Sequence, residues 1–97
     1  MARQIVWSVP AERDRKDILA YWNERNGSPT YGLKLFGRIN TALGRLLKNP
    51  FMGRPSDIPD IRVVLVEDPL LFYEVLSDAI LVHHICHGKR DLSKLEI

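Results

Sequence analysis

Three apolar runs in the C-terminal half of the chain constrain its fold most strongly. Residues 61–66, 70–76 and 79–86 have the length and the composition of β-strands, with many Val, Ile, Leu and aromatic residues. The links between them are short and carry the turn signals Asp68-Pro69 and Ser77-Asp78. Because such short links join antiparallel neighbours, the three runs predict an antiparallel sheet.

The N-terminal half begins with a pattern typical of one short strand followed by a helix. Residues 5–9 predict the strand, and Pro10, which suits the first turn of a helix, ends it. Residues 11–26 predict the first helix. Gly27 should end this helix, because glycine readily adopts the left-handed conformation of a C-cap.

A second helix is expected to follow directly. Its predicted N-cap is Ser28, with Pro29 in the first turn, and it should end at Asn49-Pro50. Gly37 and Gly44 share one stripe of this helix, which predicts the close approach of another helix there. Its apolar residues recur on one face: Leu35, Ile39, Ala42, Leu43 and Leu46. Two helices joined by so short a link predict an antiparallel hairpin.

The resulting element order is β-α-α-β-β-β. Residues 51–60, between the hairpin and the apolar runs, contain Gly53, Pro55 and Pro59 and predict a loop. We therefore expect an α+β fold in which the helical hairpin packs on one face of a mostly antiparallel four-stranded sheet. The whole chain, residues 1–97, should form a single domain.

Composition limits the classes of function that need consideration. The 97 residues are 45% hydrophobic and 27% charged, which is ordinary for a globular chain. A net charge of +2 means that any binding of polyanions must come from local patches. The single cysteine, Cys86, excludes an internal disulfide framework. Neither a signal peptide nor an apolar run of roughly 20 residues is visible, so we expect a cytoplasmic protein without a membrane partner.

Two basic clusters are candidates for binding. Lys34, Arg38, Arg45 and Lys48 fall within an arc of about 80° on the second helix, at about 100° per residue. This arc fits either a surface for an acidic partner, protein or nucleic acid, or an ordinary solvated face. The stretch 87–94 fits either a phosphate site or a solubilising tail.

Metal and cofactor chemistry find little support in the sequence. His83, His84, Cys86 and His87 lie close together, but they lack the paired spacing of a structural zinc site. The glycines match no phosphate-binding or dinucleotide-binding pattern, and no serine stands in a nucleophile elbow. We therefore expect neither a metal nor a cofactor.

A family resemblance rests on several segments in a fixed order along nearly the whole chain. The most specific are Pro50-Phe51-Met52-Gly53-Arg54-Pro55, Phe72-Tyr73-Glu74-Val75 and His87-Gly88-Lys89-Arg90-Asp91, preceded by Trp22-Asn23-Glu24-Arg25. Together they resemble the ParE/RelE toxin superfamily of type II toxin–antitoxin modules, also called plasmid stabilisation proteins, and most closely its ParE-like members. The fold of that superfamily has the same β-α-α-β-β-β order.

The resemblance implies a growth-inhibiting toxin that is neutralised by a small antitoxin encoded beside it. In this superfamily the antitoxin wraps a helical or extended segment around the toxin, and a higher-order complex is expected. Such a segment would cover an exposed apolar surface of the toxin. The residues expected to contact the antitoxin lie on the helical hairpin: Trp22, Leu35, Phe36, Leu43 and Leu47.

RelE-like members of the superfamily cut messenger RNA on the ribosome, which needs acid–base groups and cations. Under this reading the candidate catalytic residues are Arg62, His87, Lys89 and Arg90. Leu70 stands where the cleaving relatives carry an arginine, and their C-terminal tyrosine is missing as well. The catalytic set is therefore incomplete.

ParE-like members lack most of those groups and instead poison DNA gyrase by binding to one of its states. The resemblance therefore favours a toxin that is not an enzyme and that inhibits gyrase. Ribosome-dependent cleavage of messenger RNA and a non-toxic relative that still binds an antitoxin are the alternatives. The residues expected to contact the target are Arg54, Arg62, Tyr73, His87, Lys89 and Arg90.

Overall fold

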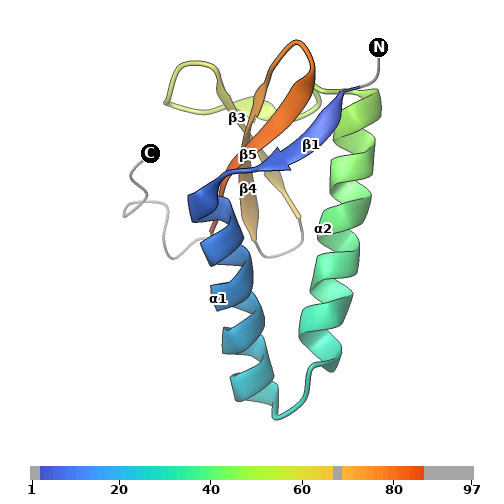
Figure 1. Cartoon of the computed structure of the whole chain (residues 1–97), viewed down its shortest axis with the longest axis vertical. Coiled ribbons are helices and arrows are strands. Elements are labelled where there is room, and N and C mark those ends of the chain that lie inside the picture. The colour runs from blue at the N-terminus through green and yellow to red at the C-terminus, as the bar shows by residue number, and fades with distance from the viewer. Residues whose placement is uncertain (1–2, 67–68, 87–97) are drawn as a thin grey trace.

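The computed structural model describes residues 3–66 and 69–86 (Figure 1). This part of the chain forms a helical hairpin and a sheet. The elements are β1 (Gln4–Trp7), α1 (Val9–Asn26), α2 (Thr30–Lys48), β2 (Arg54–Pro55), β3 (Ile61–Leu65), β4 (Leu70–Val75) and β5 (Ala79–Cys86). His87, Lys89 and Arg90 lie outside the described residues.

Helix α1 begins two residues earlier than the sequence predicts, because Ser8 is its N-cap. The Ser8 hydroxyl accepts a hydrogen bond from the backbone N–H of Ala11 at 3.1 Å and donates one to the carbonyl of His83 at 2.9 Å. Pro10 lies in the first turn, as expected, and Gly27 ends the helix at a φ of 66°. Ser8 therefore joins the start of α1 to strand β5.

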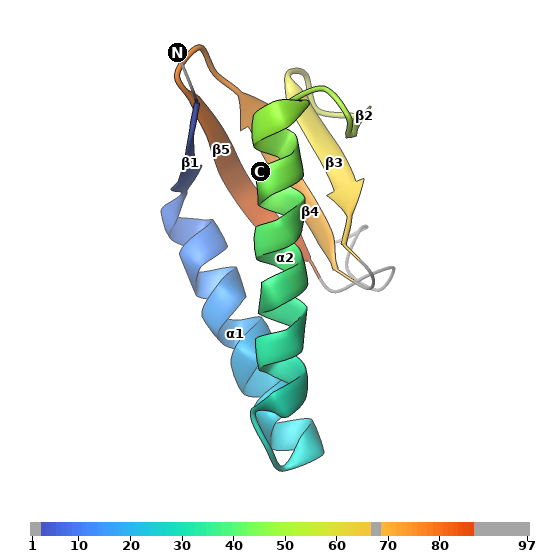
Figure 2. The same ribbon diagram turned by 90° about the vertical axis from the view of Figure 1, so that its right-hand side faces the viewer.

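Helix α2 has a different start from the one predicted. Pro29 is its N-cap and Ser28 is not, although the Ser28 hydroxyl accepts a long 3.4 Å hydrogen bond from the N–H of Thr30. The two helices form the predicted hairpin, whose closed end extends beyond the sheet (Figures 1 and 2).

Within the described residues, neither helix combines the length and the apolarity that crossing a membrane requires.

The close approach of the two helices occurs at a glycine other than the two predicted. A Cβ atom on Gly32 would lie 2.5 Å from Cδ1 of Leu19 on α1. Gly37 and Gly44 are exposed and would have no heavy atom within 4 Å of such a Cβ. The prediction for this pair is wrong because their stripe faces solvent rather than α1.

The sheet has five strands in the order β1-β5-β4-β3-β2 and is mixed rather than purely antiparallel. Strand β1 pairs in parallel with β5, although the helical hairpin and strands β2, β3 and β4 separate the two in sequence. The other neighbours are antiparallel. The fifth strand is β2, which lies inside the stretch predicted to be all loop. Its Pro55 is tolerated because β2 is an edge strand.

Both faces of the central strands are buried. On the helix side, α1 and α2 cover a core that includes Leu35, Ile39, Leu71 and Tyr73. On the other side, a smaller buried cluster has Ile58 of the loop packed against it and consists of Ile61, Val63, Leu70, Phe72 and Cys86. The near-continuous apolar character of residues 61–66 follows from this double burial.

Candidate functional site

The loop that follows α2 is held by two residues that the sequence assigns to target binding. The hydroxyl of Tyr73 donates a hydrogen bond to the carbonyl of Pro50 at 2.8 Å and accepts one from the N–H of Gly53 at 3.0 Å. Arg62 donates from Nε to the carbonyl of Gly53 at 2.9 Å and from Nη2 to the carbonyl of Phe51 at 3.2 Å. The side chain of Tyr73 is fully buried, so it offers no surface to a target.

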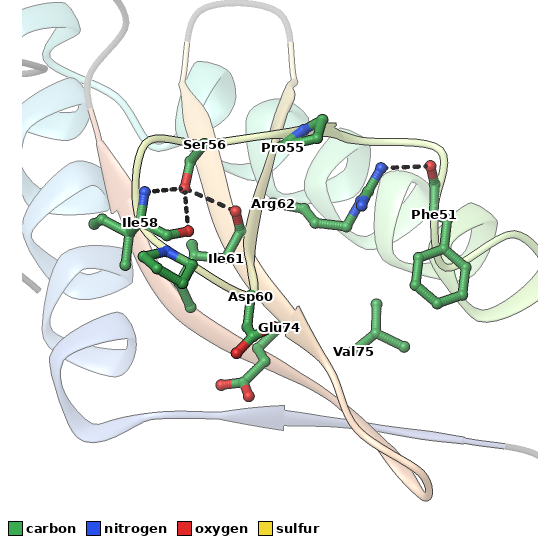
Figure 3. A pocket seen from close by; sticks show the side chains of 10 residues that line it. Phe51, Pro55, Ser56, Ile58, Asp60, Ile61, Arg62, Glu74 and Val75 are labelled. Atoms are coloured by element: carbon green, nitrogen blue, oxygen red, sulfur yellow. Dashed lines mark hydrogen bonds between the residues drawn. The ribbon is translucent and has the colours of Figure 1, made fainter.

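A hollow of about 450 Å³ opens beside this loop (Figure 3). Its walls include the carboxylates of Asp60 and Glu74 and the ring of Phe51. The guanidinium of Arg62 also borders it, but its Nε and Nη2 donate to the loop carbonyls. The guanidinium lies 5.4 Å from the centre of the Phe51 ring. Ser56 closes one side, where its hydroxyl lies 2.7 Å from the carbonyl oxygen of Ile61. Two carboxylates and an engaged cation make this hollow unsuited to a phosphate.

A β-bulge in β5 directs two consecutive histidines to different elements. Phe72 pairs with His84 and Tyr73 with Val82, which leaves His83 as the extra residue. Nε2 of His83 lies 2.9 Å from Oε1 of Glu74 on β4.

The neighbouring His84 faces α1 instead. Its Nδ1 lies 3.2 Å from Oδ2 of Asp14, and the same carboxylate oxygen accepts the backbone N–H of Ile85 at 3.0 Å. Asp14 thus ties α1 to β5. Because the two histidines contact separate carboxylates on separate elements, they do not form a shared metal site with one another.

The hairpin residues expected to contact an antitoxin fall into two groups. Leu35 and Leu43 are buried in the core of the chain, so in this structure they have no surface to offer a partner. Trp22 and Phe36 are half-buried against that core, and Leu47 is exposed. Periodicity alone could not separate these groups, since all five are apolar residues of the same two helices.

Sequence reasoning missed the apolar residues beside the basic arc of α2. A groove of about 250 Å³ lies between α2 and β3, and we call it the α2–β3 groove. It is lined by Arg38, Thr41, Ala42, Arg45, Met52, Val64, Leu65 and Val66. Leu65 is 62% exposed and Met52 is 42% exposed, although both are large hydrophobic residues. One signal for this groove is present in the sequence: two of its lining residues, Arg38 and Arg45, belong to the predicted basic arc of the second helix.

Comparison with known proteins adds a family and several similar folds. A family model described as the ParE toxin of the type II toxin–antitoxin system parDE matches residues 5–92. The chromosomal ParDE system of P. aeruginosa contains a chain of the same fold, with a TM-score of 0.79 and 22% identity over 91% of this chain and 98% of that one.

Two further solved structures share the fold. The YoeB dimer from Staphylococcus aureus has a TM-score of 0.62 and 18% identity, over 90% of this chain and 97% of that one. The E. coli DinJ-YafQ toxin-antitoxin complex contains a chain with a TM-score of 0.56 and 13% identity, over 90% of this chain and 93% of that one. None of the curated proteins compared with the chain matches its sequence significantly.

Proposed function

The chain belongs to the ParE toxin family of type II toxin–antitoxin systems, and we propose that it arrests growth in the cytoplasm by binding DNA gyrase and trapping that enzyme on cleaved DNA. In this proposal the protein catalyses nothing. It acts by binding one state of gyrase more tightly than the others. A cognate antitoxin prevents this by covering the toxin, as the pairing of toxin and antitoxin in the ParDE system of P. aeruginosa suggests.

The observation that carries the proposal is the way in which Arg62 is used. Arg62 is the only lysine or arginine in β3, β4 or β5, and its guanidinium holds the loop after α2. The carboxylates of Asp60 and Glu74 line the hollow beside it. Cleavage of RNA needs cations to stabilise the negative charge that develops on the reacting phosphate. The middle of the sheet therefore supports binding better than it supports phosphodiester cleavage.

One specific observation favours ribosome-dependent cleavage of messenger RNA as a second candidate function. His83 and Glu74 form a partly exposed pair, 2.9 Å apart, which is the arrangement of a general base with its orienting carboxylate. His87, Lys89 and Arg90 are the further catalytic candidates under this reading. The same three residues are target-contacting candidates under the gyrase reading.

The proposed contacts follow from exposure. Arg54 is exposed on the edge strand β2. Among the candidate target-binding residues that the structure describes, it is the one whose side chain is exposed. Trp22, Phe36 and Leu47 are the hairpin candidates for contact with the antitoxin. At about 100° per residue, Phe36 and Leu47 share one flank of α2. An antitoxin that covers this flank would hold the toxin along its longest element.

Induction in growing cells separates the two functions. Gyrase poisoning predicts growth arrest with chromosomal double-strand breaks and intact messages, and His83→Gln should remain as toxic as the original chain. Cleavage of messenger RNA predicts codon-linked cuts in primer extension, intact chromosomes and loss of toxicity in His83→Gln. The second pattern would contradict the proposal, and so would unchanged growth after induction at a confirmed protein level.

A further inference from the structure

The two helices of the hairpin differ in how they arrange their charged side chains. Helix α1 mixes both signs, with four acidic and four basic residues, and its Glu12 forms an ion pair with Arg15 at 2.8 Å. Helix α2 carries four basic residues and no acidic one. Because a surface with charge of a single sign attracts partners of the opposite sign, α2 favours an anionic partner.

Three of the cations on α2 are available to such a partner. Lys34, Arg45 and Lys48 are exposed, and none of them forms an ion pair within the described part of the chain. At about 100° per residue, the three lie within an arc of about 60°. Arg38 lies on the same side of the helix but already has a partner. We call the surface formed by the other three residues the α2 basic face.

The helix dipole accounts for only part of this arrangement. Arg45 and Lys48 lie in the last turn of α2, where the negative end of the dipole stabilises cations. Lys34 lies near the other end of the helix, where the dipole gives no such gain. Arg45 and Lys48 are also neighbours at i and i+3, and like charges at this spacing repel each other. An anion bound between them would relieve that repulsion.

The sign and the spacing of these charges suit the backbone of duplex DNA. A second copy of the chain on this face would place cations against cations. Protein surfaces usually intersperse both signs, which matches α1 better than α2. Duplex DNA instead carries one negative charge per roughly 1.7 Å of its axis. Lys34 lies roughly 16–21 Å along the helix from Arg45 and Lys48, so long side chains can reach both backbones that border a major groove about 12 Å wide.

We propose that the α2 basic face binds the phosphate backbone of duplex DNA. Lys34 contacts phosphates of one strand, and Arg45 and Lys48 contact phosphates of the other. Contacts to phosphates carry no sequence information, so the binding has no sequence preference. The face is separate from Phe36 and Leu47, the proposed antitoxin contacts, which lie more than about 100° away around the helix.

DNA binding of this kind is a property of the free chain, so it goes beyond the proposed function and does not require gyrase to be the target. If gyrase is the target, the same contacts hold the chain against the DNA that gyrase has cleaved.

The test measures binding of the full chain to a short labelled DNA duplex by fluorescence anisotropy at several salt concentrations. Lys34→Gln combined with Arg45→Gln should weaken the affinity at least about tenfold at low salt, and should reduce the slope of log affinity against log salt by about 2. Arg13→Gln combined with Lys16→Gln removes the same charge from the exposed surface of α1. This control should leave the affinity within about threefold and the slope unchanged.

A gain of affinity gives a readout that misfolding cannot imitate. Thr41 is exposed and lies on the same side of α2 as Lys34, so Thr41→Arg should tighten binding and raise the salt slope by about 1. Asn40→Arg is the matched control, because it adds the same charge at an exposed position about 100° away around the helix. It should tighten binding distinctly less.

The proposal is overturned if the chain binds no duplex at low salt, or if the two neutralised variants lose affinity equally. It is also overturned if polyglutamate competes as well as unlabelled duplex at equal charge, because the face would then bind acidic polypeptides. Trapping of gyrase is scored separately. A chain that binds DNA through this face but never traps gyrase contradicts the proposed function and supports this inference, whereas full trapping by a chain that binds no DNA on its own does the reverse.

Discussion

Arg62 and Tyr73 lie directly opposite each other on β3 and β4 and hold the same loop through different backbone groups. Tyr73 binds the carbonyl of Pro50 and the N–H of Gly53, while Arg62 binds the carbonyls of Phe51 and Gly53. The loop thereby receives four hydrogen bonds from two side chains of the sheet. It is fixed in place while Phe51 and Met52 remain exposed on its outside.

Tyr73→Phe should lower the free energy of unfolding by about 1–3 kcal/mol, because it removes both bonds of the hydroxyl and leaves the N–H of Gly53 buried without a partner. Urea denaturation measures the change. Tyr31→Phe is the matched control, since the ring of Tyr31 packs on Trp22 at 4.6 Å while its hydroxyl has no hydrogen bond within the described chain. It should change stability by less than about 0.5 kcal/mol. Equal effects of the two substitutions would contradict the role of the Tyr73 hydroxyl.

Gly53→Ala should destabilise the fold by about 1–3 kcal/mol, because the added Cβ would lie 2.5 Å from the Tyr73 hydroxyl oxygen and 2.9 Å from the Val63 carbonyl oxygen. Gly37→Ala, in the exposed middle of α2, should instead stabilise it by about 0.5–1 kcal/mol. Thermal unfolding of the two variants should give melting temperatures on opposite sides of the original value. A melting temperature of Gly53→Ala at or above that of the original chain would show that the loop is free to move away.

Ser8→Ala should cost about 1–2 kcal/mol, because one hydroxyl both caps α1 and binds the carbonyl of His83. Ser28→Ala should cost less than about 0.5 kcal/mol, since Ser28 is not the N-cap of α2. Chemical denaturation of both proteins checks the difference. A larger loss of stability for Ser28→Ala than for Ser8→Ala would mean that Ser28 caps α2 after all, as the sequence predicts.

Asp14→Ala should destabilise the junction of α1 and β5 by about 1–2 kcal/mol, because it leaves the N–H of Ile85 without its acceptor. Asp17→Ala, one turn along on the exposed side of α1, should have an effect below about 0.5 kcal/mol. Native-state hydrogen exchange should show faster opening at Ile85 in the first variant only. Unchanged exchange at Ile85 would mean that the pairing of β5 with β1 and β4 secures this strand without Asp14.

Local pattern predicted the elements well where neighbours in sequence are neighbours in space. The hairpin and strands β3, β4 and β5 follow from helical periodicity and short links. The parallel pairing of β1 with β5 was not predictable in the same way, because Ile5 and Ile80 are partners that lie at opposite ends of the described chain. The strand β2 was missed because Pro55 is a loop signal that a two-residue edge strand happens to tolerate.

The candidate site was harder to predict for a chemical reason. Arginine and tyrosine bind targets with the same groups that bind loop carbonyls, so Arg62 and Tyr73 looked like surface residues. Leu65 is exposed although Val63 and Val66 in the same apolar run are buried, and no local pattern distinguishes these residues. The basic arc of α2 was visible in the sequence, but the groove beside it appears only once β3 is placed next to that helix.

A cleavage assay tests whether the free protein traps gyrase on cleaved DNA, as we propose. The most direct measurement incubates the purified chain with gyrase, ATP and supercoiled plasmid, then adds detergent and protease and resolves the plasmid on a gel. Trapping predicts linear plasmid that increases with the amount of the chain and disappears when equimolar antitoxin is added first. Plasmid that stays uncleaved and is supercoiled at the normal rate, even with the chain in large excess over gyrase, would contradict it.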